Sequence, residues 1–304
     1  QFPMRELAAG GLSNSIVSAL LNPVDVSKVR MQSSLMNASL KDPIYTSPTQ
    51  TVQRIIAEEG IIRGLYLPGL TASMMRELSY SSLRFGLYTP FRSLFIQNDG
   101  ADVGLGAKIL SGGCAGSIGS VIATPTDVVK IRLQKEAGLV TDGVYTSGLH
   151  KGLNPTYPST LGAFRAIFNE GGIQGLYIGW QPTMVRAAFL AASQLSVYDH
   201  FKYTMKGNGL AEEGPGLHVA ASLVAAVNTT IVTQPFDTTK TVMITGSSGT
   251  YSGPLDCAQS IVRTKGVMFL YRGAIQSFSR FGPHFIMAMP LWERCRAILG
   301  LTPV

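Results

Sequence analysis

The sequence predicts an all-α membrane protein with six long helices in three similar repeats. Three observations support this fold class. The pattern Pro-x-Asp-x-x-Lys begins at Pro23, Pro125 and Pro235, so it recurs at nearly even spacing along the 304 residues. Charged residues make up only 14% of the chain, against roughly 25% in soluble proteins, and the mean hydropathy is positive. The chain also contains 33 glycines, which are common where helices pack closely in lipid.

Each repeat is predicted to hold two long helices with a short amphipathic helix between them. A tyrosine, an amphipathic run and a glycine-bounded turn follow each motif and keep the repeats in register. We expect repeats at 1–99, 100–206 and 207–304, with long helices at 5–35, 67–97, 105–135, 178–206, 214–243 and 273–299. Their polar residues recur at helical spacing, which suits helices with one face on lipid and one on a wet cavity. The alternative is a soluble helical core kinked at glycines.

Charge and cysteine content argue against several other classes. The net charge is +7, but no basic run with interleaved aromatics suggests nucleic acid, and a membrane protein that handles anions explains the charge better. Cys114, Cys257 and Cys295 lack ligand spacing, so neither disulfides nor zinc are expected. We find no phosphate loop or nucleophile–base arrangement, and expect no enzyme and no cofactor. The chain opens at Gln1 without a cleavable signal, which leaves a trimmed N-terminus open.

The three motif copies, each followed by a box such as Gly64-Leu65-Tyr66, resemble the mitochondrial carrier family of solute transporters. The resemblance covers essentially the whole chain. It implies six tilted transmembrane helices in threefold pseudo-symmetry around a central cavity, with three short helices on the matrix side and alternating access between two gates. It also implies a multi-pass protein of the mitochondrial inner membrane. The expected partners are a small anionic metabolite and membrane lipid, including cardiolipin, and we expect a monomer.

The first expected gate lies on the matrix side, where the motif prolines bend three helices. Proline removes one backbone hydrogen bond and kinks the helix axis, so three inward-bent ends would converge. The resulting ring would join neighbouring repeats through Asp25 with Lys130, Asp127 with Lys240, and Asp237 with Lys28. Ion pairs of this kind contribute only a modest free energy when they are exposed to water, which suits a gate that opens on every cycle. The alternative is that these charges are solvated helix ends.

One turn beyond the lysines, Gln32 and Gln134 resemble the family's glutamine braces. The third repeat departs from this pattern, with Val242 in place of a base and Ile244 in place of the brace. We therefore expect its part of the matrix gate to be weaker than the other two.

The second expected gate lies on the cytoplasmic side, where even-numbered helices of the family end in an aromatic-acid-x-x-base pattern. The gate residues carried over by the resemblance are Arg92, Asp199, Lys202, Glu293 and Arg296. The first repeat has Thr89 where the family has an acid, so at most two of three pairs can form. Arg296 is then expected to lack a partner, and a resting state open to the intermembrane side follows.

The substrate site is expected at Arg76, Arg186 and Arg280, which align at equivalent depth in the three even-numbered helices. Placing arginines in apolar helices costs free energy unless they face a water-filled cavity or anions. Because a guanidinium holds carboxylate, sulfate or phosphate with a bidentate fork, three of them argue for a small dianion. The alternative is intramolecular pairing, for instance of Arg76 with Glu77.

Three neighbours on the same helices join this predicted site: Tyr80, Arg84 and His284. His284 lies one turn from Arg280 and can carry a proton with the anion, since histidine titrates near physiological pH. A histidine that only packs between helices is an equally good interpretation. No adenine-sized slot is evident, so nucleotides rank below small acids.

We therefore expect a secondary transporter of small di- or oxo-carboxylates, or sulfate, by exchange or with protons. Residues 280–284 resemble the oxaloacetate/sulfate branch of the family, and residues 125–134 resemble the dicarboxylate and uncoupling-protein branch. The alternative is an uncoupling-protein-like proton leak activated by fatty acids. An alternative of another class is a non-transporting membrane scaffold with the carrier fold.

Overall fold

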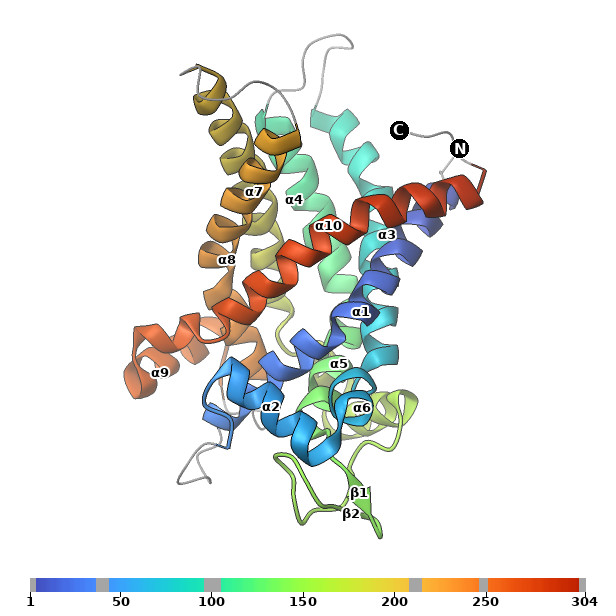
Figure 1. Ribbon diagram of the computed structural model, residues 1–304, viewed down its shortest axis with the longest axis vertical. Helices are drawn as coiled ribbons and strands as arrows, with labels where there is room; N and C mark the ends of the chain where they lie inside the picture. The colour runs from blue at the N-terminus through green and yellow to red at the C-terminus, as the bar shows by residue number, and fades with distance from the viewer. Residues whose placement is uncertain (1–3, 37–43, 96–104, 208–214, 246–250, 301–304) are drawn as a thin grey trace.

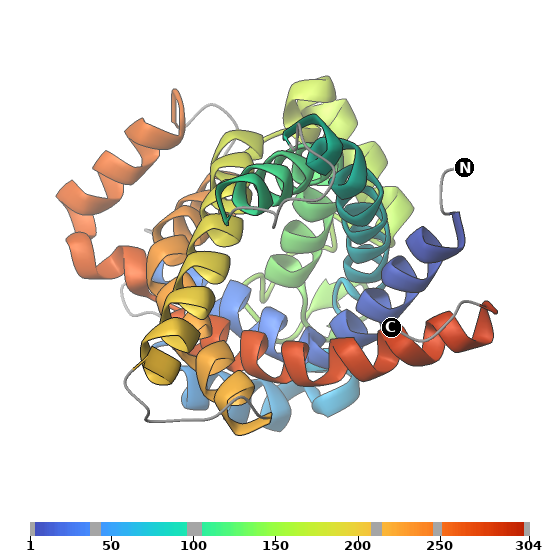
Figure 2. The same cartoon turned by 90° about the horizontal axis from the view of Figure 1, so that it is seen from above.

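The computed structural model describes residues 4–36, 44–95, 105–207, 215–245 and 251–300 and is almost entirely helical (Figure 1). Its long helices are α1 (Met4–Met36), α3 (Leu70–Phe95), α4 (Leu105–Ile122) followed by α5 (Thr124–Glu136), α7 (Trp180–Gly207), α8 (Pro215–Thr245) and α10 (Ala274–Ile298). Each packs against the next in chain order, and α10 returns to α1. Seen from above, the long helices are arranged in a closed circle (Figure 2). This confirms the predicted all-α architecture of three two-helix repeats.

The long helices are only weakly apolar. Within the described ranges, none is both long enough and apolar enough to qualify as a membrane span.

The motif prolines act differently in the three repeats. α1 and α8 continue through Pro23 and Pro235, whereas the second repeat breaks at Ala123 into α4 and α5. The prediction of one helix over 105–135 is therefore wrong at this point. Threonines flanking Pro125 satisfy carbonyls at the break: Thr124 Oγ1 donates to Ser120 O at 2.9 Å, and the hydroxyl of Thr126 donates to Ala123 O at 2.7 Å. These bonds replace part of the backbone ladder that proline interrupts.

The three short helices predicted between the long ones are present. They are α2 (Pro48–Glu59), α6 (Thr160–Leu176) and α9 (Pro254–Lys265), all in the lower half of Figure 1. The hydroxyls of Ser47 and Ser159 cap α2 and α6 by accepting from backbone amides of the first turn. α2 and α9 end at Gly60 (φ 81°) and Gly266 (φ 84°), a conformation that glycine adopts without a Cβ penalty. The predicted glycine-bounded turns therefore end two of the three helices, and α6 is kinked at Gly172 (φ 59°) in the corresponding place.

Each short helix leads into the next long helix through a brief connection. In the first repeat this is a π-helical turn (Ile62–Tyr66), and in the third it is a 3-10 turn (Val267–Tyr271).

The second repeat carries a small hairpin that the sequence analysis did not predict. Strands β1 (Val140–Thr141) and β2 (Val144–Tyr145) pair antiparallel at the lower end of the molecule (Figure 1). Asp142 and Gly143 have φ of 54° and 80°, which is the geometry of a two-residue Asp-Gly hairpin turn. The Asp-Gly pair is thus the sequence signal that would have identified this hairpin.

An ion pair fastens each of the first two short helices to the motif helix before it, and the pair of the first repeat is fully buried. Arg30 donates to Glu59 through two bonds of 2.8 Å, and both side chains are at most 1% exposed. In the second repeat Arg132 donates to Glu170 at 2.7 Å and to the Tyr157 hydroxyl at 3.0 Å. These bidentate or shared contacts fix the angle between helices that otherwise touch over a short length.

The third repeat replaces this ion pair with an apolar contact. Val242 occupies the place of the arginine and packs with Cys257, Ile261 and Phe269. Burial raises the pKa of the Cys257 thiol to about 12, so this cysteine is a packing residue at neutral pH. The expected weakness of the third part of the gate stays a prediction.

The Arg30–Glu59 pair predicts a large difference between two neighbouring glutamates. Glu59→Gln should destabilise the protein by about 3–5 kcal/mol, because it leaves the Arg30 charge buried without a counter-ion. Glu58→Gln removes only the pair with Arg54, whose side chains are 43% and 36% exposed, and should cost below about 0.5 kcal/mol. Thermal unfolding of both purified variants in detergent measures the contrast, and equal shifts would contradict it.

Candidate functional site

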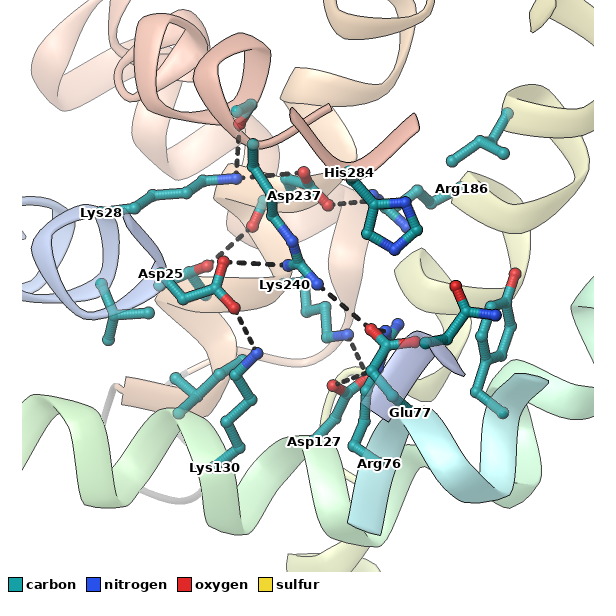
Figure 3. A pocket seen from close by; sticks show the side chains of 18 of the residues that line it. Asp25, Lys28, Arg76, Glu77, Asp127, Lys130, Arg186, Asp237, Lys240 and His284 are labelled. Carbon is teal, nitrogen blue, oxygen red and sulfur yellow. Dashed lines mark hydrogen bonds and ion pairs between the residues drawn. The ribbon is translucent and has the colours of Figure 1, made fainter. Parts of the chain in front are cut away.

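Three ion pairs join neighbouring repeats where the motif helices converge (Figure 3). They connect Lys28 Nζ to Asp237 Oδ2 at 3.1 Å, Lys130 Nζ to Asp25 Oδ2 at 2.6 Å and Lys240 Nζ to Asp127 Oδ2 at 2.6 Å. None of these side chains is more than 15% exposed. The structure therefore contains the pairing expected from the sequence, and we call these six residues the ring. Their role as a gate stays a prediction.

Each ring aspartate also holds an arginine from an even-numbered helix. Arg76 Nε lies 3.0 Å from Asp127 Oδ1 and Arg280 Nη1 lies 3.0 Å from Asp25 Oδ1. Arg186 pairs in the same way with Asp237 Oδ1. In all three carboxylates one oxygen thus pairs with the lysine and the other with the arginine.

Intramolecular pairing of the arginines, which the sequence analysis kept as an alternative, is therefore present. Arg76 pairs with Glu77, as that alternative stated. The contacts with the ring aspartates were missed, because sequence alignment placed the arginines in a separate layer. A bundle whose helices tilt inward brings that layer onto the ring, as Figure 3 shows for Arg76 and Asp127.

All six residues predicted for the substrate site line one cavity of about 490 Å³, with the ring as part of its wall. These residues are Arg76, Tyr80, Arg84, Arg186, Arg280 and His284. The guanidinium of Arg76 lies over the Tyr80 ring, 4.9 Å from its centroid. A cavity of this volume has the size of a small-molecule site.

The charges around this cavity favour an anion. Among the described lining residues, seven are lysine or arginine and four are aspartate or glutamate, which leaves a surplus of three positive charges. Arg84 differs from the other arginines, because within the described residues it forms no ion pair or hydrogen bond. Apolar Leu190 and Ala288 lie on the same wall. In the described ranges, no group of histidine, cysteine or acidic residues is arranged to hold a metal ion.

The predicted braces connect neighbouring repeats: Gln32 reaches the chain just before α10, and Gln134 reaches Asn22 on α1. Gln32 Nε2 donates to Arg272 O at 2.8 Å, and Gln134 Nε2 donates to Asn22 Oδ1 at 3.0 Å. A Cβ added at Gly273 would lie 3.1 Å from the Gln32 amide, and one at Gly69 would lie 3.0 Å from the Gln134 side chain. The missing side chains at these glycines therefore allow the close approach.

Ile244 takes the equivalent place in the third repeat. It packs beside Gly179, where a Cβ would lie 3.5 Å from its side chain. The third repeat thus keeps the packing of the brace with an apolar side chain.

The residues of the second expected gate are described only in part. The side chains of Asp199, Lys202 and Glu293 lie outside the described residues. Arg92 is exposed near the end of α3. Arg296, expected to lack a partner, has its guanidinium 4.8 Å from the centroid of the Trp292 ring. The tryptophan that replaces the family's usual tyrosine or phenylalanine therefore provides a cation–π contact.

The ion pair between Asp127 and Lys240 predicts that the two residues, 113 positions apart in the chain, are coupled in their effects on stability. Asp127→Asn and Lys240→Gln should each lower the melting temperature in detergent, because each removes a counter-ion from a buried charge. The double variant should be less destabilised than the sum of the two, by about 0.5–3 kcal/mol. As a control, Asp127→Asn combined with Lys265→Gln, at an exposed position, should be additive. Additive effects in both pairs would rule out the coupling.

Comparison with known proteins places these features in one family. The family model described as "Mitochondrial carrier protein" matches residues 1–99, 101–209 and 211–302. The chain is 34% identical to "Mitochondrial substrate carrier family protein ucpB" of Dictyostelium discoideum, over 97% of this chain and 96% of that protein. It is 31% identical to "Mitochondrial oxaloacetate transport protein" of Saccharomyces cerevisiae (94% and 87% covered) and 29% identical to "Mitochondrial uncoupling protein 5" of Arabidopsis thaliana (97% of both).

Proposed function

Because the chain belongs to the mitochondrial carrier family of multi-pass inner-membrane transporters, we propose that it carries small dicarboxylate or oxo-dicarboxylate anions by alternating access. Sulfate, a dianion of similar charge, belongs to the same proposed class. The observation that carries this proposal is the cavity, which brings together all six expected site residues and a surplus of three positive charges. Oxaloacetate, named for one relative, is such an oxo-dicarboxylate.

The arginines give the proposed site two kinds of anion contact. Among the lysines and arginines that line the cavity, Arg84 has no ion-pair partner within the described residues, so it receives a carboxylate at no cost in broken ion pairs. Arg186 has only Asp237 as an acidic partner within the same residues, and its remaining guanidinium donors can hold a second carboxylate in a planar fork. Two such contacts suit an anion with two acidic groups.

The shared aspartates provide a way to couple binding to gating. A substrate carboxylate at Arg186, Arg280 or Arg76 competes with the ring aspartate that the same arginine holds. Each ring carboxylate then keeps only its lysine, and the ring becomes easier to open. A ligand shifts a conformational equilibrium only through its different affinity for the two states, and this competition supplies that difference. The ring therefore acts, in this proposal, as the matrix gate.

His284 extends the proposal to proton-coupled transport. It lines the cavity on the same helix as Arg280, close enough to share the anion. A neutral imidazole that takes up a proton when the anion binds would move one proton with each dianion. Exchange of one anion for another uses the same site without this step.

Uptake by reconstituted vesicles tests the transport proposal. Vesicles loaded with malate should take up malate, oxaloacetate, malonate or sulfate, and Arg84→Gln or Arg186→Gln should lower uptake at least tenfold. The reason is that each loses a charge-assisted contact worth about 1.5–3 kcal/mol. Arg54→Gln, at an exposed position outside the cavity, is the matched control and should transport normally.

The same variants separate effects on the stability of the ring from effects on the proposed substrate site. Arg84→Gln should leave the melting temperature unchanged because Arg84 has no ion pair in the described structure, whereas Arg186→Gln should lower it by removing a partner of Asp237. Absence of uptake of all these anions by the folded wild type would support the scaffold alternative, and normal uptake by both variants would contradict the roles proposed for Arg84 and Arg186. Fatty-acid-dependent proton flux without metabolite uptake would support a proton leak instead.

A further inference from the structure

Glu77 places a carboxylate of the protein between two arginines of the proposed substrate site. It lies on α3, lines the cavity and is 4% exposed. Its Oε1 atom accepts from Arg76 and from Arg280 Nη2, the latter at 3.1 Å. Figure 3 shows Glu77 beside Arg76 and directed toward the centre of the cluster. A substrate carboxylate bound to this pair of guanidinium groups would make the same contacts.

This acid has no counterpart in the other repeats. The residue that follows the aligned arginine is Ala187 in the second repeat and Phe281 in the third. Threefold symmetry therefore does not require Glu77, and the ring is complete without it. Its presence makes the three arginines unequal: Arg76 and Arg280 each hold two carboxylates, and in the described structure Arg186 holds one.

The consequence is a limit on the charge that the cavity can accept. With Glu77 ionised, the cavity arginines least engaged by acids are Arg84 and Arg186, which provide two places for carboxylates. Without it, Arg76 and Arg280 would each lose one carboxylate, and the surplus of positive charge around the cavity would rise from three to four. A third carboxylate would then find a place.

We propose that Glu77 is a built-in counter-carboxylate that makes the cavity selective for dianions over trianions. This inference rests on the proposed function, since it concerns the anion carried at that site. Glu77 contributes to specificity by occupying the arginine pair that a more highly charged anion would use. Its carboxylate therefore disfavours binding of a trianion more than binding of a dianion.

The test compares malate, with two carboxylates, and citrate, with three. Initial uptake rates in malate-loaded vesicles give the citrate-to-malate ratio of kcat/KM for each variant. Glu77→Gln keeps the shape and removes the charge, and should raise this ratio at least tenfold. Glu77→Asp keeps the charge and should stay within about twofold of the wild-type ratio.

A second variant restores a carboxylate to the cavity from another helix. Asn14 lies on α1 and lines the same cavity, and Asn14→Asp adds a carboxylate there with almost no change in size. The double variant Glu77→Gln, Asn14→Asp should restore the wild-type ratio, which a merely structural role of Glu77 would not produce. If Glu77→Gln alone does not fold, the double variant decides: a wild-type ratio supports the proposal and an altered ratio overturns it.

The outcomes also separate this inference from the transport proposal. An unchanged ratio in folded Glu77→Gln, with normal malate uptake by the wild type, overturns the role of Glu77 alone. Absence of uptake of either acid by the wild type overturns the proposed function. In that case the stabilisation of wild type and Glu77→Gln by citrate and malate in thermal unfolding still reports binding, and an equal preference in the two proteins overturns the inference.

Discussion

The division of each ring aspartate between a lysine and an arginine is the constraint on which the rest of the structure depends. One carboxylate oxygen is directed at the neighbouring repeat and the other at an even-numbered helix, as for Asp127 between Lys240 and Arg76. Three carboxylates buried in this way require six cations at defined positions, because an unpaired buried charge costs several kcal/mol. The tilt of the helices, the depth of the arginines and the base of the cavity all follow from satisfying these charges together.

The repeats meet this constraint with different local solutions. The first and third carry an unbroken proline helix, and the second breaks at Ala123 and is supported by threonine hydroxyls. The short helices are fastened by Arg30 and Glu59 in the first repeat and by an apolar cluster around Val242 in the third. Equivalent backbone positions therefore accommodate either an ion pair or close apolar packing.

Much of the fold and of the site could be predicted from the sequence because the repeat supplies a register. Once Asp25 and Lys130 occur at equivalent positions of neighbouring repeats, threefold closure leaves few ways to pair them. The contact between Arg280 and Asp25 could not be obtained in this way, since it depends on how far two helices tilt toward each other. Glu77 was considered only as a local partner of Arg76, because the position of α10 beside it is a tertiary property. The break at Ala123 depends on hydroxyl contacts that no repeat pattern records.

The separation of Arg84 from the ring has a pharmacological consequence. Arg84 lines the cavity but shares no carboxylate with the ring in the described structure, so an anion held there alone leaves every Asp–Arg contact intact. Such a molecule occupies the site without weakening the ring, whereas one that also reaches Arg186 or Arg280 displaces an aspartate. Under the proposed function, an anion that reaches only Arg84 would therefore act as an inhibitor, and an anion of the same charge that also reaches Arg186 or Arg280 would be carried.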